Sequence, residues 1–326
     1  MVQLVVPGCG FLISCSGDAP SQTKEPRAAT QLERESITDS SDTPIRVVAS
    51  VPDLADIVSE VGGDEVKVSS LFKGPESLHA IDPRPVFVPM LNRADLYVEV
   101  GFQLEVPIDH ELFRLAQNKK IERGQSGYLD ASVAVTPLDC RPPGQPRKPG
   151  DAHPVCNPHY LMDPLNGLKA AETVRTKLST LRPSQKGYFD MRYASFRKRL
   201  LERLLCWYEA LLPYCGTKVI ADHNGWPYFA QRFGLECMGD LEPLSGHPPT
   251  QDYLVKVAAK AKSEGVSIIL SSSYYDPKYV QEVSAKTGAK IVPVAEQTGA
   301  REGTETYLKM MDYNVKQIVA ALQGGK

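Results

Sequence analysis

Two adjoining helical segments near the middle of the chain determine its organisation: residues 164–181, PLNGLKAAETVRTKLSTL, and residues 183–212, PSQKGYFDMRYASFRKRLLERLLCWYEALL. Residues 164–212 are typical of helix almost throughout, and the two segments are separated at Arg182-Pro183. Proline suits the first turn of a helix, because the backbone N–H that it lacks would have no helical partner there. We therefore predict a long, stiff helical connection between two other parts of the chain.

Strand and helix patterns alternate on both sides of this connection. β-branched and apolar runs predict strands at 45–51, 66–72, 96–101, 217–222, 235–241, 266–272 and 289–295. Strands that alternate with helices favour parallel sheets with helices on both faces. The predicted fold class is therefore α/β, with two lobes that each hold a short parallel sheet flanked by helices, joined by a long rigid connecting helix.

The same pattern predicts the organisation of the chain. We place the N-terminal lobe at 45–163, the connecting helices at 164–212 and the C-terminal lobe at 213–326. No internal sequence repeat relates the two lobes.

The first 17 residues, MVQLVVPGCGFLISCSG, are apolar and uncharged, and a polar segment follows them. That order is typical of an export signal, and Leu12-Ile13-Ser14-Cys15 resembles a bacterial lipobox, in which the cysteine carries the lipid. No Lys or Arg precedes the apolar run, so a buried N-terminal strand is the alternative. We expect a signal and lipoprotein anchor at 1–17, a disordered tether at 18–44 and membrane association through a lipid on Cys15.

The composition argues against several kinds of partner. The net charge is −2 and 23 % of the residues are charged, so there is no basic excess that would favour nucleic acid. No apolar run reaches the roughly 18 residues needed to span a bilayer. We therefore expect a globular monomer with no nucleic-acid partner.

The cysteines fit an exported protein loosely. Cys9 would be removed with the signal, and the five beyond Cys15 are Cys140, Cys156, Cys206, Cys215 and Cys237, so at least one is unpaired. Cys140 and Cys156 flank a Pro/Gly-rich loop and could form a disulfide, and Cys206 with Cys215 is another possible pair. No Cys-x-x-Cys occurs, which argues against a thiolate zinc site.

Three histidines and one glutamate are the candidate metal ligands. His223 and Glu296 each directly follow a predicted strand, His79 lies in the loop after the second strand, and His159 lies in the loop that enters the connecting helix. Ligands of open parallel sheets bind beyond the carboxyl ends of the strands, so we expect all four to meet in the cleft between the lobes. Three imidazoles and a carboxylate would suit zinc, and also manganese or iron.

Position alone leaves other interpretations open for each of these residues. A lone histidine is commonly a surface or hydrogen-bonded residue, and a carboxylate at a strand end is commonly a helix cap. His110 and His247 fit the surface interpretation. His153 lies close before His159 and could also be a loop ligand.

Three longer motifs resemble the solute-binding proteins of bacterial zinc/manganese ABC importers, the cluster A-I metal-binding lipoproteins. The motifs are LFKGPESLHAIDPRPVFVPMLNRADLYVEVGFQLE (71–105), GDAHPVCNPHYLMDPLNG (150–167) and VIADHNGWPYFAQRFGLE (219–236). The shorter LEPLSGHPPT and SSSYYDPK also have counterparts in that family, and the resemblance covers roughly residues 45–322. It implies two α/β lobes separated by a rigid helix.

The resemblance also implies the ligands. It assigns His79, His159 and His223 to the metal. The fourth ligand in much of the family is an aspartate just after the last strand, where Glu296 is the nearest carboxylate here. Glu296, His153 or water would fill that position. Apart from the resemblance, metal-bound histidines usually need an orienting partner, and Asp163 or Asp222 is our hypothesis for it, with a helix cap as the alternative for Asp163. The His-rich acidic loop of many zinc members is absent.

The implied function is capture of a divalent transition metal and its delivery to an ABC permease, in the periplasm or at the outer face of the cytoplasmic membrane. Zinc is favoured by the three nitrogen donors, with manganese next because of the carboxylate. The alternative is a zinc-dependent hydrolase, in which a three-histidine site activates water and Glu296 is the general base. A surface adhesin is a third interpretation, which rests on the anchor alone. We expect a binding protein without catalytic residues.

Overall fold

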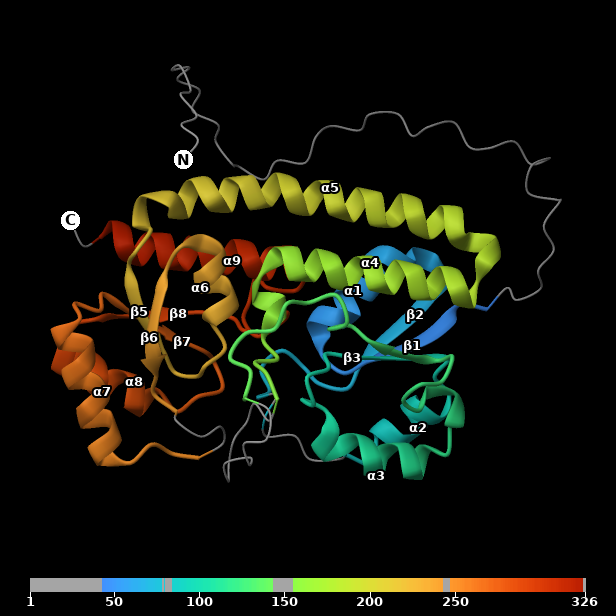
Figure 1. The fold of residues 1–326 in the computed structure, drawn as a ribbon, viewed down its shortest axis with the longest axis horizontal. Helices are drawn as coiled ribbons and strands as arrows, with labels where there is room; N and C mark the ends of the chain where they lie inside the picture. Colours follow the sequence, from blue (N-terminus) through green and yellow to red (C-terminus); the bar gives the residue numbers. More distant parts are fainter. Residues whose placement is uncertain (1–42, 78, 80–83, 143–154, 243–246, 325–326) are drawn as a thin grey trace, which may run out of the picture. The chain divides into compact units, whose positions relative to one another are not determined.

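Two four-stranded parallel sheets form the cores of the two halves of the chain (Figure 1). The computed structural model describes residues 43–77, 79, 84–142, 155–242 and 247–324. The strands are β1 (Ile45–Ala49), β2 (Val66–Ser70), β3 (Leu96–Glu99), β4 (Tyr128–Asp130), β5 (Lys218–Ala221), β6 (Glu236–Asp240), β7 (Ile268–Ser271) and β8 (Lys290–Pro293). The helices are α1 (Pro52–Gly62), α2 (Phe87–Asn92), α3 (Val106–Ala116), α4 (Pro164–Leu181), α5 (Lys186–Leu211), α6 (Pro227–Phe233), α7 (Gln251–Ser263), α8 (Pro277–Thr287) and α9 (Tyr307–Gln323).

The two sheets have the same topology. The strand order is β2-β1-β3-β4 in one sheet and β6-β5-β7-β8 in the other, and every neighbouring pair is parallel. The halves therefore repeat one architecture although no sequence repeat relates them. The predicted α/β fold with two parallel sheets is confirmed. Among the strands that the structure describes, β4 alone was not predicted, because three residues are too few to show a recognisable strand pattern.

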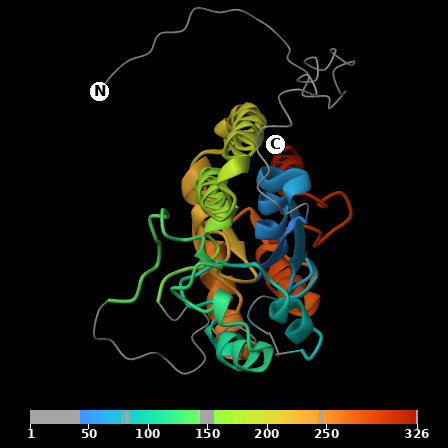
Figure 2. The same ribbon diagram turned by 90° about the vertical axis from the view of Figure 1, so that its right-hand side faces the viewer.

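The connection between the halves is a pair of antiparallel helices. The predicted break at Arg182-Pro183 is confirmed: α4 ends at Leu181 and a short 3-10 turn leads into α5. Helix α5 has 26 residues, which corresponds to about 39 Å at 1.5 Å per residue. Figure 1 shows it passing along both halves, and Figure 2, with the helices nearly end-on, shows α4 and α5 side by side.

Helix α5 holds the halves together through its buried face. Its buried side chains recur at helical spacing: Phe189, Phe196, Leu200, Leu204, Trp207 and Leu211. It packs on α1 of the first half and on α9 of the second, where the indole N–H of Trp207 donates to Asp312 at 2.9 Å. The stiff connection therefore acts as a common support for both sheets.

Direct polar contacts also join the halves beside the carboxyl ends of the strands. The Asp53 carboxylate on α1 accepts hydrogen bonds from the backbone N (3.1 Å) and Oγ1 (2.9 Å) of Thr298 in the second half. The Gln297 amide donates to the carbonyl of Glu76 at 2.7 Å. Gly74 approaches the backbone of 298–300 so closely that a Cβ would lie 2.3 Å from it. The loop that leads to His79 thus packs against the second half.

The Cys140–Cys156 disulfide is present. The alternative pair Cys206–Cys215 is not formed, and the Cys215 thiol lies 3.8 Å from the carbonyl oxygen of Phe233 instead. The predicted signal and nearly all of the predicted tether lie outside the described residues, as does His153. Among the helices that the structure describes, none is both long and apolar enough to cross a membrane.

The contact between Asp53 and Thr298 predicts a pH-dependent stability. Burial raises the pKa of Asp53 from 3.8 to about 7, although the two hydrogen bonds from Thr298 oppose the shift. Because the folded state then binds a proton more tightly than the unfolded state, this group stabilises the fold below pH 4 and loses that contribution as the pH rises toward 7. At roughly 1.4 kcal/mol per pKa unit, the loss is on the order of a few kcal/mol.

Asp53→Asn should flatten this dependence. The Asn oxygen can accept both Thr298 hydrogen bonds without a charge, so the variant should be more stable than the parent at pH 8 and differ little at pH 4. Urea unfolding of both proteins at pH 4, 6 and 8 measures the effect. An unchanged slope of unfolding free energy against pH would show that Asp53 stays ionised in the folded protein.

Candidate metal centre

Three histidines from distant parts of the chain meet between the halves. Nε2 of His159 lies 3.0 Å from Nε2 of His79 and 3.1 Å from Nε2 of His223. One ring nitrogen from each lies within 4.8 Å of the others. In the described part of the chain, this is the one cluster of three or more His, Cys, Asp or Glu side chains that could hold a metal ion. The structure therefore brings together three of the four predicted ligand residues.

Two of the imidazoles follow strands, and the third precedes the connecting helices. His223 follows β5 at its carboxyl end, with Asp222 between them. His79 lies in the loop after β2, and His159 directly precedes the short 3-10 turn that leads into α4. The carboxyl edges of the two sheets thus contribute one histidine each, and the connecting segment contributes the third.

One hydrogen bond at His159 Nε2 accounts for only one of its two close contacts with the other rings. An imidazole Nε2 carries either one proton or one lone pair in the ring plane. His159 Nε2 faces two other ring nitrogens, yet it offers a single site to them. A cation at the centre would accept a lone pair from each ring, and neighbouring nitrogens of a tetrahedral zinc site lie roughly 3.3 Å apart at a Zn–N distance of about 2.0–2.1 Å. The two spacings from His159, 3.0 and 3.1 Å, are close to that value.

Burial and aromatic packing fix His223. Its side chain is 3 % exposed and stacks on the ring of Tyr275, with centroids 5.8 Å apart and planes 20° from parallel. Nδ1 lies 3.6 Å from a carboxylate oxygen of Glu242. A carboxylate on the Nδ1 side favours the tautomer whose Nε2 lone pair points at the other two histidines.

Glu296 is buried nearby but is not part of the histidine group. Its carboxylate accepts a hydrogen bond from the Trp226 indole at 2.9 Å and another from the Tyr274 hydroxyl. A Cβ on Gly225 would lie 2.9 Å from the Glu296 carboxyl carbon, so glycine two residues after His223 makes room for this side chain. Burial raises the pKa of Glu296 to about 7, against the opposing effect of these hydrogen bonds.

The two aspartates expected to orient histidines have different roles. Asp163 caps α4 through the N–H of Leu165 and pairs with Arg232 of α6 through two bonds of 2.6 and 2.7 Å. Its carboxylate therefore joins the connecting helix to the second half. Asp222 accepts from the backbone N of Ser272 at 2.5 Å and from the backbone N of His223, so it holds the main chain beside a histidine.

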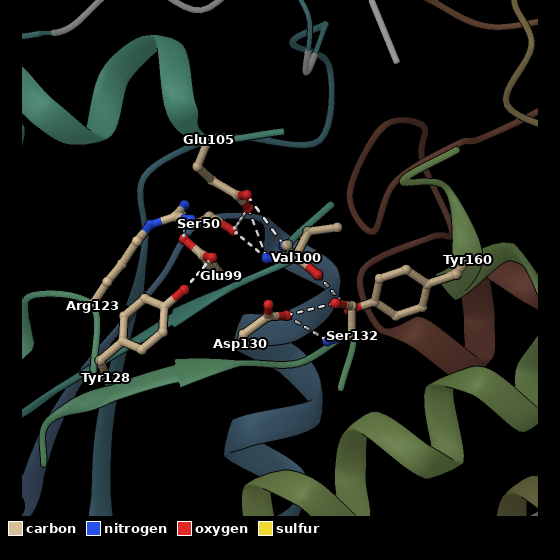
Figure 3. A network of polar contacts seen from close by, with 10 residues as sticks. Ser50, Glu99, Val100, Glu105, Arg123, Tyr128, Asp130, Ser132 and Tyr160 are labelled. Carbon is tan, nitrogen blue, oxygen red and sulfur yellow. Dashed lines mark hydrogen bonds and ion pairs between the residues drawn. The ribbon is translucent and has the colours of Figure 1, made fainter. Parts of the chain in front are cut away.

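The residue after His159 is anchored in the first half, as Figure 3 shows. The hydroxyl of the fully buried Tyr160 donates to the carbonyl of Val100 at 3.0 Å. The N–H of Val100 donates to the buried Glu105 carboxylate at 2.7 Å, and Ser50 Oγ donates to the same oxygen at 2.7 Å. This network could not be predicted from the sequence, because Tyr160, Glu105 and Ser50 come from three separate segments.

A family model matches nearly all of the described chain. The family described as Zinc-uptake complex component A, periplasmic, matches residues 47–321. That range includes His79, His159, His223 and Glu296.

Curated relatives have similar lengths and are named as transport proteins. The metal ABC transporter substrate-binding lipoprotein ScbA of Streptococcus cristatus is 22 % identical over 295 residues, which cover 89 % of this chain and 92 % of the relative. The manganese ABC transporter substrate-binding lipoprotein PsaA of Streptococcus pneumoniae is 23 % identical over 287 residues, which cover 85 % of this chain and 89 % of the relative.

Solved structures share the fold. A crystal structure of ZnuA superposes with a TM-score of 0.72 at 21 % identity and covers 86 % of this chain and 99 % of its own. The Ni²⁺ complex of FpvC from P. aeruginosa superposes with a TM-score of 0.71 at 20 % identity and covers 87 % and 98 %. Given the family match over 47–321, the chain belongs to the family of zinc-uptake complex component A, the substrate-binding proteins of metal ABC transporters.

Proposed function

We propose that the protein captures a divalent transition metal, zinc in preference to manganese, and delivers it to an ABC permease. His79, His159 and His223 are the ligands in this proposal. The observation that carries it is the convergence of three Nε2 atoms at 3.0 and 3.1 Å, which a metal ion would satisfy and hydrogen bonds would not. The metal is cargo here, so it must be bound and then released without any chemical step.

The donor set supports zinc. Three imidazole nitrogens suit zinc, whereas added carboxylate oxygens move a site toward manganese or iron. Relatives carry both metals in their names: PsaA is named for manganese, and one structural neighbour is a ZnuA variant with zinc bound. The preference for zinc therefore depends on the fourth ligand.

We propose Glu296 as that ligand. It lies beside Gly225, two residues after His223, and its burial costs free energy that a bound dication would offset. To reach the metal, the carboxylate would exchange a hydrogen bond from Trp226 or Tyr274 for a metal bond. Water and His153 are the alternatives for the fourth position.

The family match argues against the hydrolase alternative. The family consists of transporter substrate-binding proteins and not of enzymes.

The proposed place of action is outside the cytoplasmic membrane. The family description includes the word periplasmic, and the relatives are named lipoproteins. Those names support a lipid-anchored protein that serves a membrane permease, and we propose that it is a monomer with the lipid on Cys15.

His159→Ala should weaken zinc binding by at least two orders of magnitude. The variant removes the ring that contacts both other ring nitrogens, and losing one of three nitrogen donors leaves an incomplete site. Competitive titration of zinc against a chromophoric chelator measures the affinity. His110→Ala, at an exposed position on α3, is the matched control and should bind like the parent. Equal affinity in all three proteins would contradict the assignment of the site.

Glu296→Gln should change the choice of metal. The amide keeps the size of the side chain but removes its charge, so manganese affinity should fall by more than tenfold while zinc affinity falls less. Parallel titrations with zinc and manganese give the ratio. Glu236→Gln, at an exposed position on β6, controls for the loss of one surface charge. An unchanged ratio would mean that Glu296 is not a ligand.

A further inference from the structure

Asn157 lies two residues before His159 and is fully buried. Its side-chain oxygen accepts the backbone N–H of His159 at 3.0 Å. Its side-chain nitrogen donates to the backbone carbonyl of Asn224 at 2.9 Å and to the Asp139 carboxylate at 3.2 Å. One amide therefore contacts the main chain of the His159 segment and the main chain directly after His223.

These contacts use all the hydrogen-bonding groups of the amide. A primary amide has one carbonyl oxygen and two N–H donors, and each of these groups has a partner here. The orientation of the amide is fixed, because the oxygen faces a backbone N–H while the nitrogen faces two oxygens. A serine or alanine at this position could not make the three contacts together.

The backbone of Asn157 is held as firmly as its side chain. Its N–H donates to the carbonyl of Leu138 at 3.0 Å, and its carbonyl accepts the hydroxyl of Tyr228 at 2.9 Å. The neighbouring Cys156 is tied to Cys140 by the disulfide. The amide is thus a fixed point against which two histidine-bearing segments are placed.

Asp139 contacts both Asn157 and Asn224, the residue after His223. The same carboxylate oxygen that accepts from Asn157 lies 3.4 Å from the side-chain nitrogen of Asn224. Asp139 itself is exposed, so its contribution should be smaller than that of the buried amide.

We infer that Asn157 is a positioning residue of the metal site, which sets the distance between the His159 and His223 imidazoles by joining their backbones. The inference rests on the proposed function, because it concerns the same metal. Holding two ligand segments in place before the metal arrives removes part of the ordering cost of binding. Groups that orient ligands in this way typically contribute about 10- to 100-fold to metal affinity.

Asn157→Ser tests the inference by competitive zinc titration. We expect a 10- to 100-fold loss of affinity. Asn118→Ser is the matched control, because its side-chain nitrogen also donates two hydrogen bonds to backbone carbonyls, those of Leu91 and Ala94, far from the histidines. Circular dichroism and thermal unfolding of both variants separate a loss of fold from a loss of affinity. Parent-like zinc affinity in a folded Asn157→Ser would overturn the inference.

A charge exchange gives a second, independent test. Asn157→Asp keeps the acceptor for His159 but places a carboxylate against Asp139 and against the carbonyl of Asn224, so zinc affinity should fall. Adding Asp139→Asn restores a donor opposite the new carboxylate and should recover part of the loss. No recovery in a folded double variant would count against the inference.

A double-mutant cycle with His223→Ala separates positioning from general stability. If Asn157 acts by placing His223, Asn157→Ser should cost much less zinc affinity once that ring is gone, whereas an unspecific structural effect would be additive. Additivity would overturn the inference. The proposed function fails differently, through a parent protein that binds no zinc or a His159→Ala variant that binds it normally.

Discussion

Three imidazole nitrogens pointed at one small volume are the constraint on which the rest of the structure depends. Each Nε2 offers one in-plane site, so a single hydrogen bond at His159 Nε2 cannot serve both neighbouring ring nitrogens. Keeping such a group together requires a rigid surrounding, because the rings would otherwise rotate away toward better partners. The polar contacts around the histidines, from Glu105 through Tyr160 on one side to Asp222 on the other, supply that rigidity.

The two halves contribute unequally to holding the three histidines in place. The second half contributes His223 within a dense set of buried groups, with Tyr275 stacked on the ring and Glu242 beside Nδ1. The first half contributes His79, which is less buried and whose loop rests on the backbone of 298–300 through Gly74. The His159 segment lies between them and is tied to both. The site is therefore a property of the assembled halves and not of either sheet.

Much of this could be predicted from the sequence. The alternation of strand and helix patterns gave the fold class, and Arg182-Pro183 gave the break between α4 and α5. The rule that ligands lie beyond the carboxyl ends of parallel strands was enough to expect His79 and His223 near each other. The ligand roles themselves remain predictions. The contacts of Asn157 and Tyr160 could not be predicted, because each depends on segments far away in sequence that only the packed structure brings together. Glu296 is buried after β8 but lies outside the histidine group, and its role as a ligand stays a prediction. The donors Trp226 and Tyr274 that hold its carboxylate had no sequence signal.

The large sequence separations within the histidine group have a thermodynamic consequence. His79 and His159 are 80 residues apart, and His159 and His223 are 64 residues apart. An unfolded chain would hold such distant groups together only at a large entropic cost, so a metal bound by all three is bound by the folded chain alone. Metal that binds only the folded state would stabilise that state by mass action. At 100 times its dissociation constant, the metal would add about 2.7 kcal/mol to the unfolding free energy. A loaded protein should accordingly resist heat and proteases better than an empty one, and release of the metal would return it to the more easily degraded state.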